Sequence, residues 1–299
     1  MLFQIESRLK VNTVQPDATR VAEQREVRIP PEEKTLKEAM DFLRKNGFSE
    51  NRLQAWFGDA RLGLLGFPKP EPIPEGGFVR PKKEEVKKTS KAENRARLLR
   101  QYDSMSEKVY LKYKEDNHFF ELAVMGKFAK LIGLYEEDFE KAEKKYNAPK
   151  ELIAAILGIE TKFGLAEADY PVFNLFMTKI QNQPRKKAKI LEELADFLRL
   201  CKDYNVDPYS VKGSSEGAIF PGQYLPSTLY RKLERPESKS WEELSSFKTS
   251  IYLTAQYLMK KGATNMEGFE EAGKNFWAVY DYNGDPRYVR FVLELAQKY

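Results

Sequence analysis

Cysteine and histidine are almost absent: each occurs once in the 299 residues, as Cys201 and His118. A single cysteine excludes an internal disulfide and any metal site built from cysteines. A single histidine removes the usual base of a serine or cysteine catalytic triad, unless His118 itself supplies it. The segment EDNHFFELA around His118 is typical of an amphipathic helix, which favours a histidine at the surface or at the edge of the core. Triad chemistry is therefore disfavoured.

Long apolar runs are missing as well. The longest, LIAAILGI at residues 152–159, is far shorter than the roughly 20 residues needed to span a bilayer, and the N-terminal MLFQIESRLKVNTVQP lacks the apolar core of a signal peptide. A surplus of one charge is also slight, because 50 basic and 45 acidic residues leave a net charge of +5. This diffuse excess predicts no nucleic-acid partner, but it suits a weakly anionic polymer.

Helical periodicity is what the sequence has in abundance. Apolar residues recur at spacings of three and four in the segments 119–134, 135–146, 149–160, 186–204, 246–262 and 286–299. Pro149 and Pro286 each stand at the start of a predicted helix, and Gly262 closes one. Strand signals are nearly absent. We therefore predict a mainly α fold.

A proline-rich and charge-rich stretch divides the chain. We expect an extended N-terminal arm at residues 1–34, a small helical unit at 35–66, a linker at 67–94 and the main body at 95–299. In the small unit, Thr35 is the predicted N-cap of a first helix, Gly47 is its predicted stop, and a second helix follows from Ser49.

One long irregular segment, DPYSVKGSSEGAIFPGQYLPSTLY at residues 207–230, interrupts the helices of the main body. Loops of that length within a compact domain are usually functional. Its small residues let a ligand approach closely, and Ser214, Ser215 and Gln223 offer neutral hydrogen-bonding groups. Farther on, FWAVYDYNGDPRY at 276–288 gathers tyrosines and an asparagine at a turn. Aromatic faces beside neutral amides and hydroxyls are typical of a carbohydrate site.

Glu160 is the candidate acid. In the stretch LIAAILGIETKFG it lies in line with Leu152 and Ile156, on the apolar stripe of its own helix. Two interpretations are open. In the first, the helix ends here and the carboxylate leans into water. In the second, an apolar cleft surrounds the carboxyl, including Ile156 and Phe163, and desolvation raises its pKa so that it stays protonated as a general acid.

Taken in order, these motifs resemble the membrane-bound lytic transglycosylase B type of peptidoglycan lytic transglycosylases (glycoside hydrolase family 103). The pattern G-[IV]-E-T-x-[FWY]-G matches residues 158–164, and G-S-x-A-G-A-M-G-x-x-Q-F-M-P-S-S is similar to residues 213–228 without an insertion. A Y-P-R-R-like segment is partly matched at 183–186, A-N-Y-[LF] at 255–258, and Y-N-x-S-x-x-Y at 282–288. The resemblance covers roughly residues 95–299 and extends weakly to 41–60.

The resemblance implies a lysozyme-like helical globule with a long irregular active-site loop and a small N-terminal helical extension. It implies cleavage of the MurNAc-β-1,4-GlcNAc bond with formation of 1,6-anhydro-MurNAc, with Glu160 as the single acid and base. Ser214 and Gln223 would bond the substrate near the cleaved linkage. The sugar subsites are assigned to four tyrosines: Tyr113, Tyr257, Tyr282 and Tyr288.

Two further residues have less defined roles under the same resemblance. Asn283 would orient an acetamido group or Glu160 itself. Arg185 would meet a carboxylate of a stem peptide through its planar guanidinium, or it is only an exposed arginine at the start of a helix.

Departures from the family pattern are also visible. Glu216, Ile219 and Phe220 stand where the family commonly has Ala, Met and Gly, so the loop is bulkier and carries an extra carboxylate, which would raise the pKa of Glu160 further if it pointed inward. After Ser227 the sequence RKLERPESKSWEELS lacks the D-x-D-x-D-G spacing of calcium ligands, so we expect no metal and no cofactor. The stretch GATNMEGFEEAGK replaces a longer segment of many relatives, which predicts a lower wall on one side of the cleft.

Two alternatives remain at this point: a lysozyme-like muramidase, in which water replaces the sugar hydroxyl, and a non-catalytic peptidoglycan-binding or scaffold relative. The expected partners are peptidoglycan glycan strands and other cell-wall enzymes, with membrane contact only through a lipid anchor outside this chain. We expect a monomer in the periplasm or cell envelope, with its export signal also outside this chain.

Overall fold

The computed structural model describes residues 29–65, 90–116, 121–162, 168–236 and 240–298, so His118 and Phe163 lie outside the described residues. The fold is mainly α, as predicted. The helices are α2 (Glu33–Lys45), α3 (Glu50–Phe57), α5 (Lys91–Asp103), α6 (Glu107–Asp116), α7 (Glu121–Leu134), α8 (Glu136–Tyr146), α9 (Lys150–Glu160), α10 (Val172–Asn182), the 3-10 turn η4 (Pro184–Lys186), α11 (Lys187–Asp203), α12 (Pro226–Arg231), α13 (Trp241–Leu244), α14 (Phe247–Lys260), α15 (Lys274–Tyr282) and α16 (Pro286–Gln297).

The segments predicted from periodicity are confirmed as α7, α8, α9, α11, α14 and α16, each within a few residues of its expected ends. Gly262 follows α14 with a φ of 93°, as a helix stop should. The predicted N-cap at Thr35 is wrong: α2 already begins at Glu33, and Thr35 lies inside it on the buried face with Ala39 and Leu43. The four-residue spacing of these three residues gives α2 its apolar face.

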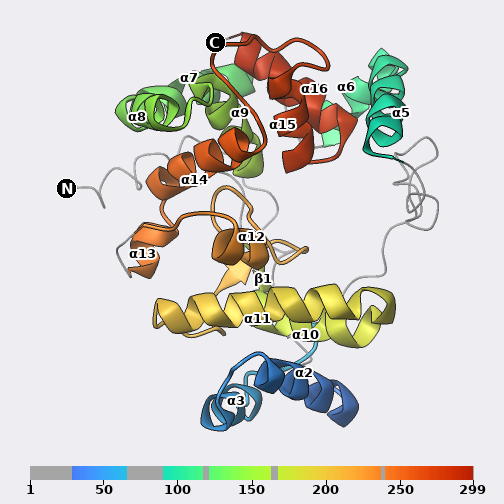
Figure 1. Cartoon of the computed structure of the whole chain (residues 1–299), viewed down its shortest axis with the longest axis vertical. Coiled ribbons are helices and arrows are strands. Elements are labelled where there is room, and N and C mark those ends of the chain that lie inside the picture. Colours follow the sequence, from blue (N-terminus) through green and yellow to red (C-terminus); the bar gives the residue numbers. More distant parts are fainter. Residues whose placement is uncertain (1–28, 66–89, 117–120, 163–167, 237–239, 299) are drawn as a thin grey trace, which may run out of the picture.

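Two hydrophobic cores form, and each surrounds one helix that is buried along nearly its whole length (Figure 1). In the upper tier of the figure, α9 buries every residue from Leu152 to Ile159 and packs against α7, α8, α14 and α16. In the lower tier, α10 buries every residue from Val172 to Ile180 and packs against α11 and α2. A helix that is buried all round belongs in the centre of a core.

Helix α14 joins the two tiers. Its Ile251, Ala255 and Leu258 belong to the upper core, whereas Leu253 and Tyr257 pack into the lower one. The only strands in the described residues are two of two residues each, β1 (Tyr170–Pro171) and β2 (Lys212–Gly213), which pair antiparallel. They hold the start of α10 beside the long irregular segment.

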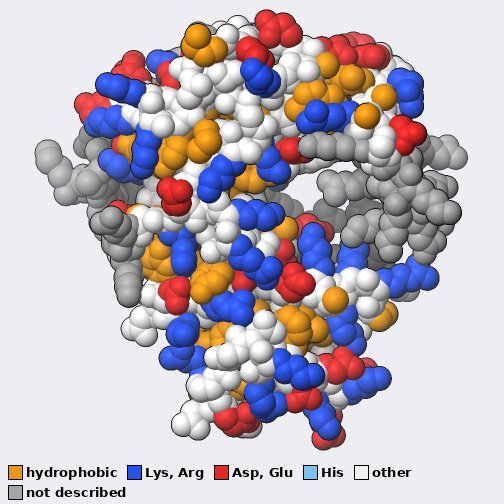
Figure 2. Space-filling model, viewed as in Figure 1, with side chains coloured by type: hydrophobic (Ala, Val, Ile, Leu, Met, Phe, Trp, Pro, Cys, Tyr) orange, Lys and Arg blue, Asp and Glu red, His pale blue; other side chains and the backbone are white. Residues whose placement is uncertain are grey.

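The division of the chain into arm, helical unit, linker and main body stays a prediction, and most of the arm and linker, 1–28 and 66–89, lie outside the described residues. The expected linker includes residues 91–94, which are helical, because α5 begins at Lys91 after a capping box between Ser90 and Glu93. Acidic and basic side chains are interspersed over the face seen in Figure 2, as the mixed charges of the sequence imply.

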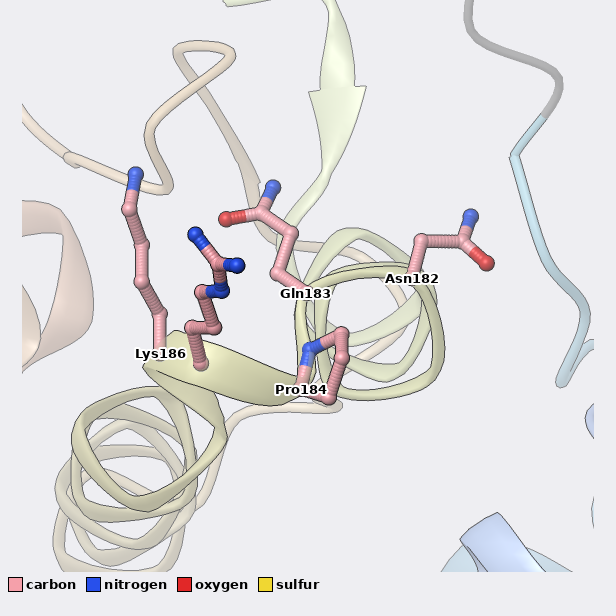
Figure 3. A pocket seen from close by; sticks show the side chains of 5 residues that line it. Asn182, Gln183, Pro184 and Lys186 are labelled. Carbon is pink, nitrogen blue, oxygen red and sulfur yellow. The ribbon is translucent and has the colours of Figure 1, made fainter.

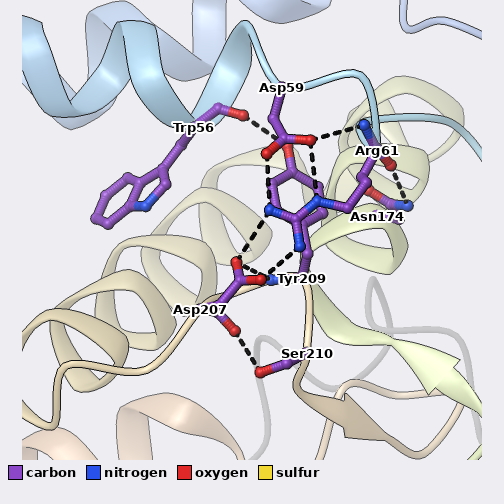
Figure 4. Close-up of polar contacts among 7 residues, drawn as sticks. All are labelled: Trp56, Asp59, Arg61, Asn174, Asp207, Tyr209 and Ser210. Atoms are coloured by element: carbon purple, nitrogen blue, oxygen red, sulfur yellow. Dashed lines mark hydrogen bonds and ion pairs between the residues drawn. The ribbon is translucent and has the colours of Figure 1, made fainter.

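Helices α2 and α3 pack on the lower tier through Ala39, Leu43 and Leu53, and a polar cluster adds to this contact (Figure 4). The guanidinium of Arg61 contacts Asp59 at 2.7 Å and Asp207 at 2.5 Å, and it lies 4.6 Å from the ring centre of Tyr209. The Tyr209 hydroxyl donates to the backbone carbonyl of Trp56 at 2.6 Å. Asp207 opens the long irregular segment, so this cluster ties the N-terminal helices to the base of that loop.

We predict that Arg61→Ala loosens this attachment, because Arg61 alone bridges Asp59 and Asp207. Hydrogen exchange of the α2 and α3 amides should become faster, while that of α9 stays as in the wild type. The matched control is Arg44→Ala, since Arg44 pairs only with Asp41 and Glu50 inside the unit itself. Equal exchange in the Arg61 and Arg44 variants would show that the cluster does not hold the unit in place.

Candidate active site

Glu160 is the last residue of α9, directly after eight buried residues. Its carboxyl accepts a hydrogen bond from the hydroxyl of Tyr288, with 2.8 Å between Oη and Oε1. Glu160 keeps some solvent-accessible surface, so the end of the buried helix delivers a carboxyl to the edge of the upper core. The negative end of the helix dipole lies at the same place, and it disfavours a carboxylate there.

The pKa of Glu160 is raised from 4.5 to about 7. Desolvation by the surrounding protein is the main cause, and the hydrogen bond from Tyr288 opposes it by favouring the ionised form. The carboxyl is therefore protonated in a large share of molecules near neutral pH. This is the property that the second interpretation of the sequence required.

Four tyrosines lie near enough to Glu160 for its charge to raise their pKa: Tyr113 on α6, Tyr224 on the irregular segment, Tyr282 at the end of α15 and Tyr288 on α16. Burial raises the pKa of each phenol, and the nearby charge of Glu160 raises it further. The phenols therefore stay neutral and keep their protons for hydrogen bonds.

The irregular segment reaches this cluster through a short hairpin. Ile219 and Tyr224 form a bridge, and the hydroxyl of Tyr282 donates to the backbone carbonyl of Gly222 between them. The hydroxyl of Tyr224 shares a 2.5 Å hydrogen bond with Thr254 on α14. Thus α14, α15 and the loop are linked beside Glu160.

Ser214 and Gln223 both lie on the loop, and their side chains bond to the loop itself. The Ser214 hydroxyl accepts from the backbone amides of Glu216 at 3.3 Å and Ala218 at 3.2 Å. The Gln223 amide donates to the carbonyl of Phe220 at 3.2 Å. Both side chains therefore shape the loop, and their contact with substrate stays a prediction.

Phe220 has a φ of 67°, which lies in the left-handed region where glycine is favoured. A glycine, as in the family pattern quoted above, would adopt this conformation without strain. The ring of Phe220 packs edge-on against Trp241, with 5.0 Å between the ring centres. That contact offsets part of the backbone strain.

Two further predicted residues, Tyr257 and Asn283, contact α15 and the turn that follows it. The ring of Tyr257 packs against that of Tyr282 at 5.0 Å, and its hydroxyl donates to the carbonyl of Asp281 at 2.7 Å. Asn283 directly follows α15, and its side-chain oxygen accepts from the amide of Asp285 at 3.2 Å.

Arg185 lies apart from this cluster, and no contact joins it to Glu160 within the described part of the chain. It belongs to η4 and lines a surface hollow with Asn182, Gln183, Pro184 and Lys186 (Figure 3). Gln183 and Lys186 extend to the same side of this hollow, whereas Asn182 points away.

Glu216, the extra carboxylate of the loop, does not act on Glu160. It forms an ion pair with Lys179 of α10 at 2.9 Å, and it is not among the groups that shift the pKa of Glu160. The described residues also contain no cluster of three metal-ligating side chains.

Sequence reasoning missed three residues at the site: Tyr224, Thr254 and the backbone of Gly222. A signal for Thr254 was present, because Ser250 and Thr254 are polar residues four apart on an otherwise apolar stretch of α14. Both are fully buried, and both contact the Tyr224 hydroxyl, Ser250 through its carbonyl at 3.1 Å.

Solved structures identify the class of the fold. An Escherichia coli lytic transglycosylase in complex with calcium superimposes with a TM-score of 0.64 at 18% identity, covering 95% of this chain and 97% of that one. SltB3 of Pseudomonas aeruginosa in complex with NAG-anhNAM-pentapeptide gives a TM-score of 0.66 at 15% identity, covering 89% and 78%. The fold is therefore that of the lysozyme-like, helical lytic transglycosylases, as the sequence motifs implied.

Sequence comparison gives the family. The family model described as transglycosylase SLT domain matches residues 32–262, and the chain belongs to this family. The membrane-bound lytic murein transglycosylase B of Escherichia coli (strain K12) is 34% identical over 94 residues, which are 31% of this chain and 26% of that protein. The resemblance inferred from the sequence motifs is confirmed.

None of the helices in the described residues is long and apolar enough to cross a bilayer.

The hydrogen bond from Tyr288 yields a first prediction for the site. Because this bond lowers the pKa of Glu160, Tyr288→Phe should raise that pKa above about 7. The alkaline limb of kcat/KM against pH should then move to higher pH, even though the rate itself falls. A limb that stays in place or moves to lower pH would show that Tyr288 does not act on the carboxyl.

A second prediction concerns stability. A folded pKa of about 7 against 4.5 when exposed means that the folded state binds the proton more tightly than the unfolded state. The free energy of unfolding therefore loses roughly 3 kcal/mol as pH rises from 4.5 to about 7, and it loses no more above that. Glu160→Gln lacks this penalty, so it should be more stable than the wild type at pH 8 and equal to it near pH 4. Denaturant unfolding at both pH values measures the difference in the free energy of unfolding between the variant and the wild type. The same difference at pH 4 and pH 8 would indicate a solvated carboxyl.

Proposed function

We propose that the protein is a peptidoglycan lytic transglycosylase, which cleaves the MurNAc-β-1,4-GlcNAc bond and leaves a 1,6-anhydro-MurNAc end. The observation that carries the proposal is the carboxyl of Glu160, whose pKa is raised to about 7 by its surroundings at the end of a buried helix. Family membership supplies the substrate class, since the relatives' names specify murein and a muropeptide ligand. The match covers only 26% of the length of the curated relative. The proposed activity is therefore argued from the geometry of the site as well as from that match.

In the first step, protonated Glu160 donates its proton to the oxygen that links the two sugars. The bond from this oxygen to C1 of MurNAc breaks, and GlcNAc leaves with the proton as a new hydroxyl. Positive charge develops at C1, where the substrate's own acetamido group stabilises it. General acid catalysis of this kind is typically worth about 10²–10⁴-fold.

In the second step, the Glu160 carboxylate takes the proton from the C6 hydroxyl of the same MurNAc. The C6 oxygen bonds to C1 and closes the 1,6-anhydro ring, which returns Glu160 to its protonated form. The hydroxyl belongs to the substrate, so its effective concentration far exceeds that of a water molecule. The hydrogen bond from Tyr288 stabilises the carboxylate between the two steps.

The surroundings of Glu160 support a mechanism with a single carboxylate. Asp285 is the neighbouring acid, since it and Glu160 both raise the pKa of Tyr113. Asp285 is engaged, however: it accepts from the backbone amide of Arg287 at 2.9 Å and forms an ion pair with its guanidinium at 2.7 Å. A carboxylate that caps a helix and binds an arginine is a poor nucleophile or base.

Binding of the glycan strand is proposed for the residues predicted from the sequence. Tyr257, Tyr282 and Tyr113 supply aromatic faces to the sugars, and Ser214 and Gln223 contact the sugar rims from the loop. Arg185 of the η4 hollow meets a carboxylate of a stem peptide. We propose the cell envelope, where this polymer lies, as the location and a monomer as the working state.

We predict that Glu160→Gln loses at least about 10²-fold in turnover of purified sacculi, because it keeps its shape but has no acidic proton to donate. Circular dichroism and binding to sacculi should stay as in the wild type. Mass spectrometry of wild-type products should show 1,6-anhydro ends. Reducing MurNAc ends would identify hydrolysis instead, and wild-type turnover by Glu160→Gln would exclude Glu160 as the acid.

A further inference from the structure

The turn of Gly213 to Gly217 contacts α10 at three successive points. At the start of α10, Gly213 lies so close to Val172 that a Cβ built on Gly213 would come within 2.9 Å of the Val172 side chain. One turn along, Gly217 lies so close to Phe176 that a Cβ built on it would come within 2.7 Å of the ring. Gly217 also has a φ of 82°, so only glycine suits this position.

The third point is the ion pair between Lys179 and Glu216, at 2.9 Å. Lys179 follows Phe176 by three residues, so the two side chains share a face of α10. The exposures of the partners differ greatly: the side chain of Lys179 is 9% exposed and that of Glu216 is 79% exposed. Glu216 is the only ion-pair partner of Lys179 among the described residues, and a buried ammonium is costly without one.

The turn determines what the Ser214 hydroxyl can offer to a ligand. A hydroxyl has one proton to donate and two positions at which it accepts. The amides of Glu216 and Ala218 occupy both accepting positions. The Ser214 hydroxyl can therefore serve a ligand only as a donor. One of the two amides that orient this hydroxyl is the backbone amide of Glu216, whose side chain is paired with Lys179.

We propose that Glu216 is a positioning residue for substrate binding: with Lys179 it forms a clamp that holds the turn on α10, so that the Ser214 hydroxyl donates to an oxygen of the glycan strand. This rests on the proposed function. The clamp requires both the ammonium of Lys179 and the carboxylate of Glu216, and it sets how firmly the loop is held for substrate binding.

The test compares Glu216→Ala, Glu216→Gln and the double variant Lys179→Met/Glu216→Ala with the wild type, on soluble peptidoglycan glycan strands. Glu216→Ala should raise KM about 10-fold, the loss of one well-placed hydrogen bond, and leave kcat within about twofold. Glu216→Gln, whose amide oxygen still accepts from Lys179, should recover most of the wild-type KM.

The double variant separates positioning from stability. Lys179→Met removes the unpaired ammonium, so Tm should return to near the wild-type value, while KM stays raised because nothing holds the turn. Hydrogen exchange at Gly217 and Ala218 should be faster in the double variant as well. A matched control, Glu38→Ala, breaks the ion pair with Lys187 between α2 and α11 and should leave KM unchanged.

Two results would overturn the clamp. One is a wild-type KM in Glu216→Ala, and the other is a wild-type KM in the double variant, which would reduce the pair to a stabilising contact. Neither result bears on the proposed function, which is tested separately by the 1,6-anhydro ends among the products of the wild-type protein. If the wild type does not cut glycan strands, the exchange rates at Gly217 and Ala218 still decide whether the pair holds the turn.

Discussion

Desolvation of one carboxyl is the constraint on which the arrangement around the site depends. A protonated glutamic acid near neutral pH requires surroundings that disfavour its charge, and the buried helix α9 carries Glu160 to such a place. The hydrogen bond from Tyr288 lowers the pKa of Glu160 and so stabilises its ionised form. An acid that must give up a proton and take one back needs both influences, because a pKa far from ambient pH would block one of the two steps.

The irregular loop near this carboxyl is held by contacts from both tiers. Tyr282 and Thr254 bind the hairpin at Gly222 and Tyr224 from the side of α14 and α15. Helix α10 holds the turn before it, and Arg61 holds the base of the segment through Asp207. Most of this loop lacks regular structure, and contacts with helices at several points hold its shape.

Much of the fold could be predicted from the sequence, because amphipathic helices show their periodicity, and Glu160 became the candidate acid because it stands on an apolar stripe. Helix α10 was not predicted, because its buried polar residues Asn174, Thr178 and Lys179 interrupt the apolar spacing that marks a helix in the sequence. The partners of Glu216 and Tyr224 were also hidden, because Lys179 and Thr254 are 37 and 30 residues away and only the packed fold brings them together. Whether Glu216 pointed toward Glu160 or away was a question of side-chain direction, which spacing in the sequence does not encode.

The most direct test of this account is the pKa of Glu160 itself, measured by a carbon-13 NMR titration of the glutamate side-chain carboxyls with Glu160→Gln to assign the signal. The account predicts one carboxyl that titrates near pH 7 in the wild type and is missing from the variant. A Glu160 signal that titrates near the ordinary value of 4.5 would contradict it, because the carboxyl would then be solvated and would have lost the proton that the proposed reaction needs.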